Sequence, residues 1–145
     1  MLLQEAREAA LGPSNTTAII DNIHDGGYPT GLRWLVISLK NSCRSRLVMN
    51  DVDGARRDAF AATIFSRNTD ADAHECLAEV CAASSDAVGE LQGLKSAVRQ
   101  YDILEQEYSI PMPGSDEVAR KRSHAAAKKQ ELGFRINKLE RILLG

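Results

Sequence analysis

The chain has 145 residues and a formal net charge of −2 at pH 7, with 43% hydrophobic and 26% charged residues. This length allows one ordinary domain with a buried core, and this composition excludes a chain that is disordered throughout. The slightly acidic balance argues against a dedicated nucleic-acid-packaging protein, although it leaves room for a local basic patch. Alanine and leucine are abundant and only 5% of residues are aromatic, which favours an all-α fold.

The start of the chain and its cysteines indicate where the protein resides. Glu5, Arg7 and Glu8 interrupt the stretch in which a signal peptide needs an unbroken apolar run, and no segment reaches about 18 apolar residues. The cysteines are odd in number and offer no good disulfide pair, which fits a reducing compartment. We therefore expect a cytoplasmic protein that does not span a membrane.

Glycine, proline and capping residues divide the first part of the chain into about four shorter helices. The first two are expected over residues 2–11 and 15–24, and each is followed by a glycine-containing turn. A third helix, capped by Thr30, carries apolar residues at steps of three and four, and a fourth covers residues 55–66. The stripe on the third helix consists of Leu32, Leu35, Val36, Leu39, Cys43 and Leu47.

The second half of the chain predicts a long antiparallel helical hairpin. From about Ala71 to Tyr108 no proline interrupts, and apolar residues recur in a heptad ladder that is typical of coiled-coil packing. Two prolines and a glycine in residues 109–115 predict a turn, after which a last helix returns along the first. Ser115, followed by two acids, is a good cap for that last helix.

The two arms of this hairpin carry opposite charge. Residues 69–108 hold nine acidic residues against two basic ones, a net of −7, and residues 116–145 hold four against eight, a net of +4. Opposite charges on adjacent helices set register and partner choice more than stability. We therefore expect a helical head over residues 1–68 and the hairpin over residues 69–145, in one continuous domain.

The hairpin also has more apolar ladder than two helices can hide from water. We therefore expect a non-enzymatic assembly or adaptor protein that oligomerises, or docks on a protein partner, through the hairpin. The partner seam is expected at Leu91, Leu94, Val98, Leu132, Ile136 and Leu139.

An alternative function is nucleic-acid binding. The helix-turn-helix pattern from Ala18 to Lys40 resembles units whose second helix enters the major groove, and Arg33-Trp34-Leu35 is similar to the recognition helix of phage small terminases and some transposases. The turn over residues 25–29 is longer than usual for such units. The alternative is an accessory protein with phosphate contacts at Arg33, Lys40, Arg44, Arg120, Lys121, Arg122, Lys128 and Lys129.

The segment from Asp70 to Cys81 is the richest in metal-ligating residue types. On a helix, however, only His74 and Cys81 share a face, and they lie about 10 Å apart along the axis. The segment therefore predicts no metal site.

Catalysis and cofactor binding are not predicted either. The histidines His24, His74 and His124 fall on separate helices, so no spacing supports a catalytic triad. The glycines of residues 26–31 lack the spacing and the lysine of a phosphate-binding loop. We expect no cofactor, and a small enzyme or metal protein is the third and least favoured class.

Overall fold

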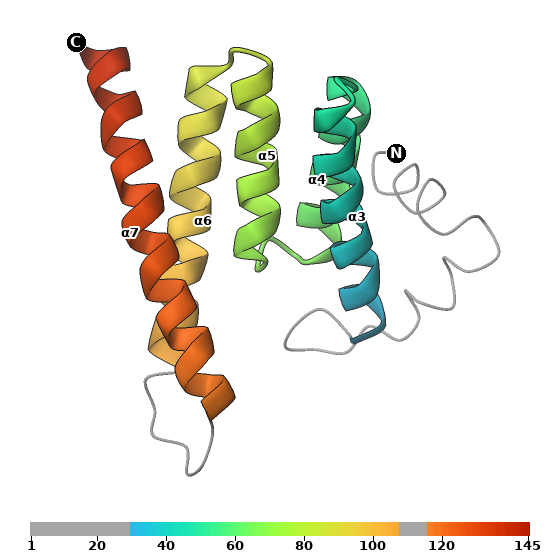
Figure 1. The fold of residues 1–145 in the computed structure, drawn as a ribbon, viewed down its shortest axis with the longest axis vertical. Helices are drawn as coiled ribbons and strands as arrows, with labels where there is room; N and C mark the ends of the chain where they lie inside the picture. Colours follow the sequence, from blue (N-terminus) through green and yellow to red (C-terminus); the bar gives the residue numbers. More distant parts are fainter. Residues whose placement is uncertain (1–29, 108–115) are drawn as a thin grey trace, which may run out of the picture.

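The computed structural model describes residues 30–107 and 116–145, and these residues form helices and no strand (Figure 1). The expected all-α class is confirmed for this part of the chain. The helices expected over residues 2–11 and 15–24 lie outside it. Among the described helices, none combines the length and the apolar character that a membrane crossing requires. The helices are α3 (Thr30–Val48), α4 (Val52–Phe65), α5 (Ala71–Ala83), α6 (Ala87–Glu107) and α7 (Asp116–Leu144).

The prediction of a single helix over residues 71–108 is wrong, because the chain reverses direction between α5 and α6. Ser85 has a positive φ of 59°, and the carboxylate of Asp86 accepts a hydrogen bond of 2.9 Å from the backbone N–H of Gly89. Serine and aspartate bond to nearby backbone groups and so compete with a continuous helix. The heptad pattern did not indicate this turn, because apolar residues recur with the same spacing before and after the turn.

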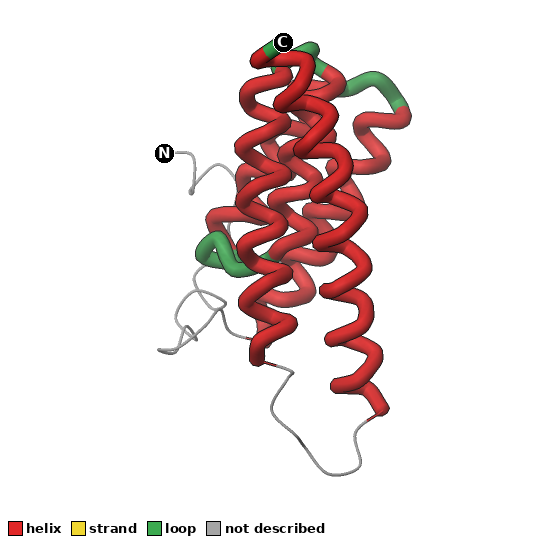
Figure 2. The backbone as a smooth tube through the Cα atoms, turned by 90° about the vertical axis from the view of Figure 1, so that its left-hand side faces the viewer, coloured by secondary structure: helices red, strands yellow, loops and turns green. Residues whose placement is uncertain are grey.

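Successive helices run in opposite directions, and α5 occupies the middle of the array (Figure 1). It packs against α3 and α4 on one side and against α6 on the other, and α6 in turn packs against α7. The view in Figure 2 shows these helices running along one common long axis. The expected two-helix hairpin with coiled-coil packing is not confirmed, since three antiparallel helices stand where it predicted two.

Three apolar clusters form the core, and α5 contributes to each. Ala73 joins the cluster between α3 and α4, Cys76 and Val80 join a second cluster on the same side, and Ala78 joins the cluster with α6 and α7. The predicted boundary between residues 68 and 69 therefore does not separate two cores.

A close approach of α5 and α6 depends on Gly93. A Cβ atom at this position would lie 3.0 Å from the Cβ atom of Ala78 and 3.1 Å from its backbone nitrogen. The absence of a side chain at Gly93 thus lets the two helices pack backbone against backbone.

Candidate functional site

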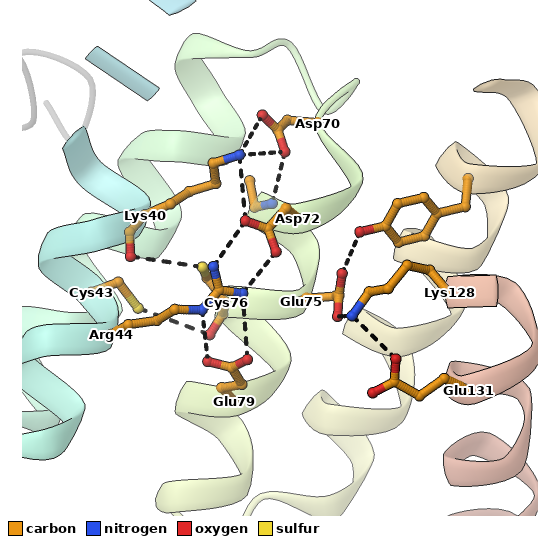
Figure 3. A network of polar contacts seen from close by, with 12 residues as sticks. Lys40, Cys43, Arg44, Asp70, Asp72, Glu75, Cys76, Glu79, Lys128 and Glu131 are labelled. Atoms are coloured by element: carbon orange, nitrogen blue, oxygen red, sulfur yellow. Dashed lines mark hydrogen bonds and ion pairs between the residues drawn. The ribbon is translucent and has the colours of Figure 1, made fainter. Parts of the chain in front are cut away.

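The most extensive polar network of the described residues joins α3 to α5 (Figure 3). Lys40 Nζ lies 3.0 Å from Asp70 Oδ2 and 3.4 Å from Asp72 Oδ2. Arg44 donates two hydrogen bonds to the Asp72 carboxylate, at 2.9 Å and 2.7 Å, and its Nε lies 3.4 Å from Glu79 Oε2. Lys40 and Arg44 are therefore both engaged within the chain.

The pKa values of these groups keep the network charged. Two hydrogen bonds to Asp72 raise the pKa of Arg44. Burial by itself would raise the pKa of Asp72, but the hydrogen bonds and charge of Arg44 outweigh it and hold this pKa below its usual value. Burial would lower the pKa of Lys40, and the charge of Asp70 reverses this and raises it. All three groups are ionised at neutral pH.

A second network joins the other side of α5 to α6 and α7. Glu75 is only 3% exposed, and its carboxylate accepts a hydrogen bond from the Tyr101 hydroxyl. Lys128 Nζ lies 2.8 Å from the other carboxylate oxygen, and it also lies 3.3 Å from Glu131 at the surface. Burial and the hydrogen bond to Glu75 raise the pKa of Tyr101.

This second network suits a structural clamp better than catalysis. Each oxygen of Glu75 already has a donor, so the carboxylate is not poised to take a proton from a ligand. Because α5 and α7 have no direct backbone packing, the side chain of Lys128 spans the gap and ties α7 to the middle helix.

Cys43 of α3 and Cys76 of α5 lie within the core, and Cys81 of α5 is half-buried. Cys43 Sγ lies 4.0 Å from the carbonyl oxygen of Cys76, and Cys76 Sγ lies 4.0 Å from that of Lys40. Contact with Cys43, together with burial, raises the pKa of Cys76, so this thiol stays protonated and is a poor nucleophile. Over residues 30–107 and 116–145, no group of three or more His, Cys, Asp or Glu residues is arranged to hold a metal ion.

A cleft of about 690 Å³ opens where α3 and α5 begin and α6 ends. Arg33, Asp70, Tyr101 and His124 are among its lining residues, and the rings of Tyr101 and His124 meet edge to face with centroids 6.0 Å apart. Asp70 is engaged by Lys40, and the Tyr101 hydroxyl is engaged by Glu75. Two of the polar groups of this cleft are therefore engaged within the chain, whereas among the described residues no ion pair involves Arg33 or Glu107.

Most of the cations predicted as phosphate contacts have acidic partners inside the chain. Lys129 Nζ lies 2.7 Å from Asp102 and 2.9 Å from Glu105, and Lys121 lies 3.3 Å from Glu117. With Lys40, Arg44 and Lys128, five of the eight are thus paired. Among the described residues, no ion pair involves the other three, which are Arg33, Arg120 and Arg122.

The structure packs the predicted partner seam, apart from Leu91, against the chain's own core, and Leu91 is half-buried on α6. Leu94 and Leu132 are both fully buried in the cluster shared by α5, α6 and α7. Val98, Ile136 and Leu139 are half-buried and pack against the same cluster. The prediction that these residues form a surface for a partner is therefore corrected. They face the chain's own core, and residues of α5 cover part of them.

A different face of α7 is open to solvent. Because α7 packs only against α6 among the described helices, the side of α7 opposite Leu132 has no neighbour there. We call this the outward face, and every residue on it is classed as exposed. It consists of Arg120, Ser123, Ala127, Gln130, Glu131, Phe134, Asn137, Lys138, Arg141 and Ile142.

Two apolar side chains of the outward face were not singled out by sequence reasoning. Phe134 is 68% exposed and Ile142 is 65% exposed. Phe134 follows Leu132 by two residues, which places it about 160° around the helix from Leu132, and Ile142 follows by ten, which places it about 80° away at the edge of the outward face. These positions were the signal that could have found them. The buried pairing of Glu75 with Tyr101 and Lys128 was also missed, and no local pattern marks it.

Comparison with known protein families, curated proteins and solved structures found no match to this chain. The argument for function therefore rests on the chain's own residues.

Proposed function

We propose that the chain is a non-enzymatic helical adaptor that assembles with itself or docks on another protein through the outward face of α7. The observation that carries this proposal is the exposure of Phe134 and Ile142 on a helix with only one packing neighbour among the described elements. Isolated exposed apolar residues are common on proteins, but here the two share a face on which Glu131 is paired with Lys128, whereas Lys138 and Arg141 form no ion pair with another described residue.

The ionic networks support the same proposal indirectly. They hold α3, α5, α6 and α7 in one rigid arrangement and leave few polar groups available for chemistry. A module of this kind presents a preformed surface and pays little ordering entropy when a partner binds. Nucleic-acid binding has less support, since five of its eight expected cations are paired with acids of the same chain.

The mass in solution tests the self-assembly branch of this proposal. If the chain assembles with itself through this face, light scattering gives a mass above the 15.8 kDa of one chain, and Phe134→Glu with Ile142→Glu returns the mass to that of one chain. Ile103→Glu is the control, because Ile103 is also an exposed apolar residue, 42% exposed, but lies on α6. A mass that is the same in all three proteins contradicts self-assembly through this face.

A further inference from the structure

The outward face of α7 has a charge pattern as well as apolar side chains. It includes three cations, Arg120, Lys138 and Arg141, and none of them forms an ion pair with another described residue. Of the four acids of α7, Glu131 lies on this face, and three of the four pair with lysines. Those three are Glu117 with Lys121, Glu131 with Lys128, and Glu140 with Lys95.

The spacing on this face matches a helical partner. Phe134, Lys138, Arg141 and Ile142 follow the steps i, i+4, i+7 and i+8, so they form one continuous strip along the axis. From Arg120 to Ile142 the strip is about 33 Å long at about 1.5 Å per residue, enough for several turns of a second helix. Along the axis, the two cations lie between Phe134 and Ile142.

We infer, on the basis of the proposed function, that the partner of this face is an acidic amphipathic helix of another protein. Its apolar residues would cover Phe134 and Ile142, and carboxylates between these contacts would lie against Lys138 and Arg141. Charge complementarity selects this partner. A basic helix would place its charges next to Lys138 and Arg141 and weaken binding by repulsion, and an uncharged helix would offer these two cations no carboxylate.

The same complementarity argues against a second copy of this chain as the partner. Two outward faces would bring cations against cations, and many acids of α5 and α6 are already engaged by Lys40, Arg44, Lys128 and Lys129. An acidic helix from elsewhere satisfies both the apolar and the basic residues of the strip.

Two synthetic peptides of about four heptads test this inference. Each carries leucine at the a and d positions, and one has glutamate at the e and g positions where the other has lysine. Like charges keep each peptide from pairing with itself. Binding to the full chain is measured by fluorescence anisotropy of the labelled peptide at low and physiological salt.

We expect the glutamate peptide to bind and the lysine peptide to bind at least about tenfold more weakly. Phe134→Ala should weaken the glutamate peptide by about tenfold or more, as expected for a central aromatic contact. Lys138→Glu with Arg141→Glu should reverse the preference, so that the lysine peptide becomes the tighter ligand. Arg99→Glu is the control, since Arg99 is an exposed cation on α6, and it should change neither affinity.

Equal binding of the two peptides, or an equal effect of Arg99→Glu and the double variant, would overturn the inference. So would a mass above that of one chain that Phe134→Glu abolishes, because a second copy would then occupy the face, while the proposed function would stand. Tight binding of a short DNA duplex through Lys138 and Arg141, with no binding of the glutamate peptide, would overturn both. Circular dichroism of each variant confirms that these exposed substitutions leave the helices intact.

Discussion

The buried carboxylate of Glu75 gives a sharp test of how α7 is held. Glu75→Gln keeps the shape of the side chain but removes its charge, and it puts an N–H donor where either Tyr101 or Lys128 now donates. Removing one partner of a buried ion pair costs about 3–5 kcal/mol, and the retained amide should reduce the loss here to about 2–4 kcal/mol. With a urea slope of about 1.5 kcal/mol/M, the unfolding midpoint should fall by about 1.3–2.7 M.

Glu131→Gln is a matched control because Glu131 pairs with the same lysine. Its side chain is 58% exposed, whereas that of Glu75 is 4% exposed, so solvent screens the outer pair. Loss of an exposed pair costs about 0–1 kcal/mol, and the midpoint should move by less than about 0.7 M. Urea unfolding followed by circular dichroism measures both. If the two variants shift the midpoint equally, the buried contacts of Glu75 with Tyr101 and Lys128 do not hold α7 in place.

Three further predictions concern helix packing, the pH dependence of stability, and the separate roles of the buried and exposed residues of α7. Gly93→Ala should destabilise the protein by about 1 kcal/mol, because the new methyl group meets the backbone of Ala78, whereas Gly133→Ala, which meets nothing within 4 Å, should stabilise it by about 0.4–1 kcal/mol. Equal thermal midpoints for the two variants would refute the close approach of α5 and α6. The lowered pKa of Asp72 means that its contribution to stability is complete above the ordinary carboxyl value of about 3.9 and is lost as pH falls through the lower folded value. Urea midpoints of Asp72→Asn should therefore lie below those of the wild type at pH 7 and converge with them as the pH falls below about 4, and a constant difference would contradict this assignment. Leu132→Ala should cost about 2–5 kcal/mol of stability, and Phe134→Ala should cost less than about 0.5 kcal/mol while weakening partner binding. The opposite pattern in denaturation and binding assays would place the partner on the buried side.

Local signals in the sequence were sufficient for most helices. The apolar stripe from Leu32 to Leu47 falls within α3, and the cap at the start of the last helix agrees with α7 beginning at Asp116. The turn at Ser84–Asp86 was missed, because an apolar period of seven continues through it and short polar residues also occur within helices. Its signal was the run of two serines and an aspartate, which favours caps and turns.

The candidate surfaces were harder to predict than the helices. Periodicity correctly indicated that Leu94 and Leu132 must be buried, but it says nothing about which element covers them. Residues of α5 cover part of these side chains. The sequence prediction did not include this contact, because it treated residues 71–108 as one helix. Similarly, Glu75 looked like a surface acid, since its partners Tyr101 and Lys128 lie 26 and 53 positions further along the chain.

Site-specific photo-crosslinking in living cells tests most directly whether the outward face of α7 meets a protein. A benzophenone side chain at position 134 keeps the aromatic ring of the phenylalanine it replaces and adds a benzoyl group, and the same side chain at position 103 is the control. The account predicts a discrete adduct from position 134 that is lost when Lys138 and Arg141 are changed to glutamate, and none from position 103. No adduct from position 134, or the same adducts from both positions, would contradict it.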